Sequence, residues 1–106
     1  MYRTPDRRIK PRINCDYPAI FEGYDGYGNR YNDHGRLSNL SASGLFILTN
    51  RRVENGSRLS VTILLTDSSG DMDAPKIATN GMVVRTESQL DGTCGIAIKF
   101  NKYRFL

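Results

Sequence analysis

The chain has 106 residues, 39% of them hydrophobic and 25% charged, which suffices for one domain with a modest core and leaves no room for a second. The longest uninterrupted apolar run, residues 45–48, is far shorter than the ~20 residues that span a bilayer. The polar start also lacks the apolar segment of a signal peptide, so we expect a soluble, cytoplasmic protein without a membrane span.

The formal net charge of +4 is concentrated in residues 1–12, because residues 13–106 carry equal numbers of acidic and basic side chains. In the first twelve residues a single acid, Asp6, is opposed by Arg3, Arg7, Arg8, Lys10 and Arg12. This asymmetry predicts a basic arm, residues 1–12, that meets an anionic partner, next to a neutral domain, residues 13–106. The alternative is a solvated tail that binds nothing.

A period-two pattern begins at Ile13, where odd-numbered residues as far as Phe21 are mostly apolar. It predicts a strand with one buried face, and Pro18 indicates an edge or a bulge within it. Residues 23–35 are rich in glycine, asparagine and aspartate, so we expect a long connection there. A strand pair is expected next, at residues 35–41 and 44–49.

The second half of the chain continues the same pattern. We predict a strand at residues 57–66 and a polar loop at residues 67–75. Another strand is expected at residues 76–88, with a bulge at Gly81. Asp91 and Gly92 suit the tight turn of a final hairpin, after which every second residue from Cys94 to Phe100 points inward. We find no helical stripe, so the sequence predicts an all-β fold, either a sandwich or, as we prefer, a small antiparallel barrel.

The sequence offers little for catalysis or metal binding. His34 is the only histidine and lies in the glycine-rich segment, where a solvated turn residue is expected. Cys15 and Cys94 lack the close pair spacing of zinc ligands and are expected to be reduced and buried, a single disulfide being the alternative. The acidic loop with Asp67, Asp71 and Asp73 lacks the ordered ligand positions of a calcium loop. We therefore expect no enzyme, no metal and no cofactor.

Two polar segments remain as candidate binding elements. The arm contains Arg8-Ile-Lys-Pro-Arg12, preceded by Arg7, and arginine can grip phosphate or a guanine edge with two parallel hydrogen bonds. The second segment, Asn39-Leu-Ser41-Ala-Ser-Gly44, supplies an amide, hydroxyls and a glycine that permits close approach. Taken alone, the second segment is equally a turn between strands.

Together and in this order, the two segments resemble the motifs of the PilZ domain, a family of bacterial receptors for the second messenger cyclic di-GMP. That family carries Arg-x-x-x-Arg before the first strand and Asp/Asn-x-Ser-x-x-Gly in the barrel. The resemblance covers about residues 6 to 101 and implies a six-stranded antiparallel barrel that binds its ligand on the outer surface without turnover.

The resemblance also implies the ligand-binding residues. Arg8 and Arg12 would engage guanines and phosphates, Asn39 and Ser41 would hydrogen-bond the ligand, and Gly44 would permit close packing. Arg7 stands where the family often sets whether one ligand or an intercalated pair binds.

Two features depart from the pattern. Asn39 replaces the commoner aspartate and accepts a weaker hydrogen bond than a carboxylate would. The sequence ends at residues 101–106 without the C-terminal helix of many members, so we expect a minimal domain or a barrel end covered by a partner.

The expected function is therefore a cyclic di-GMP receptor or adaptor that changes conformation or contacts with an unidentified effector protein when ligand binds, the arm becoming ordered as it is filled. One alternative is a small barrel that binds single-stranded nucleic acid through Tyr24, Tyr27 and Tyr31. Another is an interaction module that no longer binds nucleotide.

Overall fold

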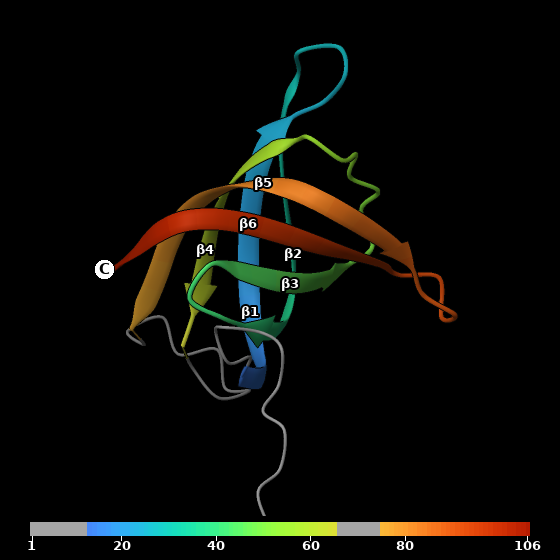
Figure 1. Ribbon diagram of the computed structural model, residues 1–106. Helices are drawn as coiled ribbons and strands as arrows, with labels where there is room; N and C mark the ends of the chain where they lie inside the picture. The colour runs from blue at the N-terminus through green and yellow to red at the C-terminus, as the bar shows by residue number, and fades with distance from the viewer. Residues whose placement is uncertain (1–12, 66–74) are drawn as a thin grey trace, which may run out of the picture.

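Six antiparallel strands close into a barrel in the computed structural model, which describes residues 13–65 and 75–106 (Figure 1). They are β1 (Ile13–Tyr24), β2 (Arg30–Leu40), β3 (Gly44–Thr49), β4 (Arg58–Leu64), β5 (Lys76–Ser88) and β6 (Cys94–Phe105). The order around the barrel is β1-β2-β3-β6-β5-β4, and β4 pairs with β1 to close it. The predicted all-β, six-stranded antiparallel barrel is confirmed, with no helix in the described ranges and hence none that could cross a membrane.

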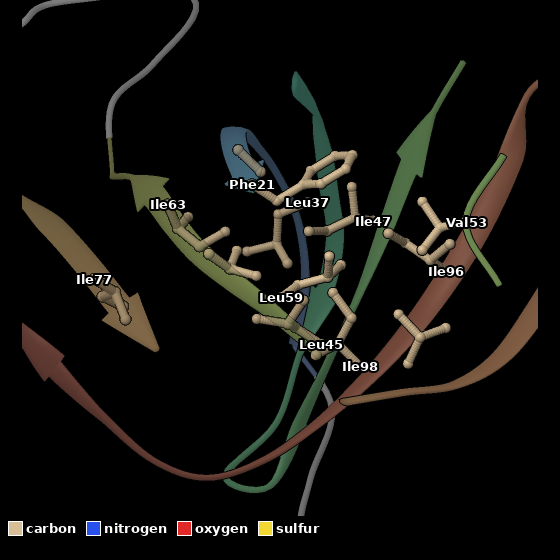
Figure 2. Close-up of a cluster of buried hydrophobic side chains, with 13 residues drawn as sticks. Phe21, Leu37, Leu45, Ile47, Val53, Leu59, Ile63, Ile77, Ile96 and Ile98 are labelled. Carbon is tan, nitrogen blue, oxygen red and sulfur yellow. The ribbon is translucent and has the colours of Figure 1, made fainter. Parts of the chain in front are cut away.

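Apolar side chains from the inner face of every strand fill the inside of the barrel and form the core. The buried positions alternate along β3 and β4 as a strand with one inward face requires. Figure 2 shows the side chains of Phe21, Leu37 and Ile47 converging with those of β4 and β6. Closure removes the free sheet edges, so all of this apolar surface is buried without a second layer.

The prediction of a long connection over residues 23–35 is wrong. β1 and β2 form a hairpin with Tyr24 opposite Arg30, and only residues 25–29 turn. Gly23 lies within β1 and Gly35 within β2. Neither position has room for a side chain, because a Cβ added at Gly23 would be 2.7 Å from Leu59 Cδ2 and one added at Gly35 would collide with the Leu48 carbonyl oxygen. These two glycines mark close packing of strands rather than turns.

His34 likewise lies within β2 opposite Ile20 rather than in a turn, although its predicted exposure is confirmed. Cys94 is a free thiol but is half-buried, not buried as expected. The Cys15 side chain and the loop with Asp67, Asp71 and Asp73 lie outside what the structure describes. Among the described side chains, no group of three or more His, Cys, Asp or Glu residues could hold a metal ion.

One of two backbone features predicted for the second half is confirmed. The pairing of β5 with β6 shifts register between Thr79 and Gly81, but the extra residue lies on β6, because Thr79 stands opposite Tyr103 and Gly81 opposite Phe100. The bulge predicted at Gly81 is therefore on the partner strand, and inward and outward positions alternate through Gly81 without a break. Gly92 has a φ of 90° in the turn between the same strands, a conformation that glycine adopts without steric cost.

The barrel core supplies the stability. Ile96 is fully buried, so Ile96→Ala is expected to lower the free energy of unfolding by about 2 to 5 kcal/mol, measured by urea denaturation. Ile20→Ala is the matched control, because Ile20 is 51% exposed and should cost less than about 1 kcal/mol. Equal losses for the two variants would contradict the assignment of inner and outer faces.

Candidate ligand groove

The turn between β2 and β3 is organised by the hydroxyl of Ser41. Ser41 Oγ accepts a hydrogen bond from the Ser43 N–H at 3.4 Å and donates to the Gly44 carbonyl at 3.3 Å. The Ser41 N–H donates to the same carbonyl at 2.9 Å. These bonds fix the positions of Ser41 and Gly44 relative to each other, although the two lie three residues apart.

Gly44 lets the start of β3 approach β6 closely. A Cβ added at Gly44 would lie 3.0 Å from the Ile98 carbonyl oxygen, which is a crowded distance. The Phe100 N–H donates to the Ser43 carbonyl at 3.0 Å and so ties the turn to the same strand. The turn therefore rests directly on the outer wall of the barrel.

A groove of about 250 Å³ lies on this outer wall beside the turn. Its described lining brings together the three predicted residues of the second motif with β5 and β6: Asn39, Ser41, Ser43, Gly44, Leu45, Phe46, Val84, Arg85, Ala97, Ile98 and Lys99. None of these lining residues is acidic, and the groove combines an amide, two serine hydroxyls, two cations and an apolar floor. Such a surface suits an anion that also carries flat, apolar faces.

The strand register arranges the groove as two rows. One row crosses four strands from Asn39 through Phe46 and Ala97 to Arg85. At the usual spacing of ~4.8 Å between strands, the row is about 14 Å long when measured along the curved barrel wall. In the neighbouring row Gly44 stands opposite Lys99.

Two β-bulges place the ends of the long row on the outer face. Leu37 points inward, and regular alternation would turn Asn39 inward too, but the register of β2 and β3 shifts between them. The register of β5 and β6 shifts in the same way between the buried Val83 and Arg85. Each extra residue reverses the alternation, so Asn39 and Arg85 both face the groove.

Gly95 keeps the groove floor open by accommodating Phe46. A Cβ at Gly95 would collide with Cζ of the Phe46 ring, so the ring lies over the glycine backbone. Ala97, the next outward residue of β6, is therefore left at the floor of the groove with only a methyl group.

Arg85 and Lys99 are groove residues that sequence reasoning missed. Arg85 Nε lies 2.7 Å from Glu87 Oε2, with both side chains substantially exposed. A signal for Arg85 was present, because the inward series of β5 ends in an arginine, and a cation at an inward position indicates either a buried partner or a bulge.

The first motif, with Arg7, Arg8 and Arg12, lies outside the described residues. The register nevertheless locates where the chain enters the barrel. Ile13 is opposite Leu40, and Asn14 is opposite Asn39. The first described residue of β1, which directly follows Arg12 in the sequence, therefore lies beside the second motif.

The three tyrosines of the alternative interpretation lie at the other end of β2 from Asn39. Tyr24 and Tyr27 are exposed around the hairpin tip. The Tyr31 ring is covered by the Arg51 guanidinium, whose carbon is 4.1 Å from the ring centroid, and burial raises the pKa of Tyr31. Its ring face is thus already occupied, which reduces the stacking surface available to a base.

The sequence matches the PilZ domain family over residues 6–104, which is most of the chain. The chain belongs to the PilZ domain family. No curated protein sequence matches it.

Three solved structures share the PilZ fold at low sequence identity. The inhibitor of motility MotI (DgrA) from Bacillus subtilis is 14% identical, with a TM-score of 0.70 over 94% of this chain and 45% of its own. The PilZ domain of YcgR from Escherichia coli, solved with c-di-GMP, is 15% identical, with a TM-score of 0.57 over 90% and 78%. The MrkH–c-di-GMP complex from K. pneumonia is 17% identical, with a TM-score of 0.59 over 91% and 45%. The chain thus spans less than half the length of MotI and MrkH.

The contact between Phe46 and Gly95 can be tested by a double-mutant cycle. Gly95→Ala is expected to destabilise this PilZ domain by about 1 to 3 kcal/mol, since the added methyl collides with the ring. In a Phe46→Ala background the same change should cost much less, as measured by urea denaturation. Additive costs would show that the ring does not lie over Gly95.

Proposed function

We propose that this PilZ domain is a receptor for cyclic di-GMP that holds the nucleotide on the outer wall of its barrel. The observation that carries the proposal is the assembly of Asn39, Ser41 and Gly44 in one groove, beside the start of β1 at Ile13. Two of the structurally similar proteins, YcgR and MrkH, were solved with c-di-GMP. Family membership and groove chemistry therefore support the same ligand.

The roles of the motif residues follow from their chemistry. Arg8 and Arg12 supply planar, charged forks suited to phosphates and guanine edges, and Arg7 adds a third guanidinium, at the position that the family resemblance associates with the number of ligands bound. Asn39 offers both a donor and an acceptor at one end of the groove, and the hydroxyl of Ser41 lies beside it. Gly44 has no side chain, so the turn packs closely against β6 and leaves space for a ligand beside the barrel wall.

Binding without turnover is part of the proposal. The groove is lined by amide, hydroxyl, cationic and apolar groups, which neutralise and hydrogen-bond an anion. Cyclic di-GMP is accordingly a ligand of the domain rather than a substrate, and no further cofactor is invoked.

The domain would transmit a signal because a bound ligand links the arm to the barrel wall. A ligand held by both motifs changes what the arm and the groove present to an effector protein, which makes the domain an adaptor. It would act in the cytoplasm, where a bacterial second messenger is read.

The binding proposal predicts that Arg8→Ala, Arg12→Ala and Ser41→Ala each weaken cyclic di-GMP binding by about ten- to a hundredfold in calorimetric titrations. The arginine variants each remove charge-assisted hydrogen bonds worth about 1.5 to 3 kcal/mol, and Ser41→Ala removes a hydroxyl that lines the groove and also holds the turn in place. Arg58→Ala, which removes an exposed arginine of β4 outside the groove, is the matched control and should bind as the parent does.

Binding by the alanine variants at parental strength would refute this assignment. Equal competition by linear dinucleotide or random single-stranded DNA, with affinity falling steeply as salt rises, would favour a nucleic-acid-binding barrel. Chromatography of the nucleotide after incubation with the protein should recover it intact, and magnesium- or manganese-dependent formation of linear product in proportion to the purified protein would reveal turnover.

Coupling of the arm to the groove can be followed by limited proteolysis. Saturating cyclic di-GMP should slow tryptic cleavage after Arg7, Arg8 and Arg12, because bound guanidinium groups cannot enter the protease. Cleavage after Lys10 is blocked by Pro11 and reports nothing. Ser41→Ala at the same nucleotide concentration should lose the protection, and identical rates with and without nucleotide would exclude the coupling.

A further inference from the structure

One residue that lines the groove, Arg85, forms an ion pair with Glu87. Arg85 lines the groove, whereas its carboxylate partner Glu87 is not among the lining residues. The two residues are separated by two positions on β5 and so share the outer face of that strand. Arg85 therefore has two possible partners, Glu87 on one side and an anion in the groove on the other.

We infer that Arg85 is an additional contact for a phosphate of the ligand, and that Glu87 competes with the ligand for Arg85 and thereby sets the affinity. This inference rests on the proposed function, because it takes cyclic di-GMP as the occupant of the groove. It assigns a role to the side of the groove opposite Asn39.

The position of Arg85 supports this role. Arg85 closes the row that begins at Asn39, and the bulge after Val83 turns its side chain out of the core. Lys99 lies on the adjacent strand, two residues from Ala97 on the same face, and adds a second positive charge. A ligand that spans the groove from the second motif reaches both cations across the apolar floor.

The ion pair is weak enough for a ligand to displace. Arg85 and Glu87 are 56% and 44% exposed, and exposed pairs of this kind contribute little to stability. A phosphate offers the guanidinium a bidentate partner with more charge than one carboxylate. Glu87 therefore lowers the affinity for the ligand modestly, and Arg85 can still leave Glu87 to bind a phosphate.

The test is a double-mutant cycle read by calorimetric titration with cyclic di-GMP. Arg85→Ala should weaken binding by about ten- to a hundredfold, and Arg85→Lys, which keeps the charge and loses the fork, should lie between Arg85→Ala and the parent. Glu87→Gln should tighten binding by about two- to fivefold in the parent. In the Arg85→Ala background Glu87→Gln should produce no gain, because the competition no longer exists.

Two controls separate this mechanism from changes in overall charge. Arg58→Ala and Glu54→Gln remove the same charges at exposed positions outside the groove and should leave the affinity unchanged. Parental affinity in Arg85→Ala, or an equal gain from Glu87→Gln in both backgrounds, would overturn the inference. A parent protein that does not bind cyclic di-GMP would instead refute the proposed function, so the two failures are distinguishable.

Discussion

The site depends on two breaks in the alternation of the barrel strands. A closed barrel commits every second residue to its core, which leaves only the outward half of each strand for binding. The bulges next to Leu37 and Val83 reverse that alternation once on β2 and once on β5. As a result Asn39 and Arg85 face outward at the two ends of one row, while the residues before them still contribute to the core. Without either bulge, a polar group would be directed into the apolar interior at a cost of several kcal/mol.

The depth of the groove comes from side chains that are absent. Gly95 has no side chain, so the Phe46 ring can lie over its backbone, and Ala97 fills little of the floor. Gly44 permits the turn to approach β6. Because these small residues lie on the outer face, they shape the groove without reducing the core, although Phe46 packing on Gly95 connects the groove shape to the stability of the wall.

Sequence reasoning predicted the barrel because strict period two in β1, β4 and β6 leaves a single apolar face to bury. It predicted Asn39, Ser41 and Gly44 as ligand-binding residues from one short motif, and the structure places all three along the same groove. It missed Arg85 and Lys99, which become neighbours of that motif only through the pairing of β3 with β6 and of β6 with β5. It also interpreted the glycines of residues 23–35 as turns, since composition alone does not distinguish a glycine that bends the chain from one that lets strands pack closely.

The other described ion pairs explain how a neutral barrel can present a basic groove. Arg36 donates to Asp16, Arg30 pairs with Glu22 at 2.8 Å, and Arg51 pairs with Asp33 at 3.0 Å, all outside the groove. The hydrogen bond from Arg36 lowers the pKa of Asp16, so the ionised form of that carboxylate is favoured relative to a free aspartate. Exposed pairs such as these add little to stability, but each removes a local excess of positive charge from the barrel surface. Lys99 takes part in none of the ion pairs of the described residues and therefore leaves a positive charge at the groove, while the net charge of the sequence lies in residues 1–12. Screening confines surface fields to about 8 Å at physiological salt, so the positive charges of Arg85 and Lys99 act on an anion at the groove rather than over the barrel as a whole.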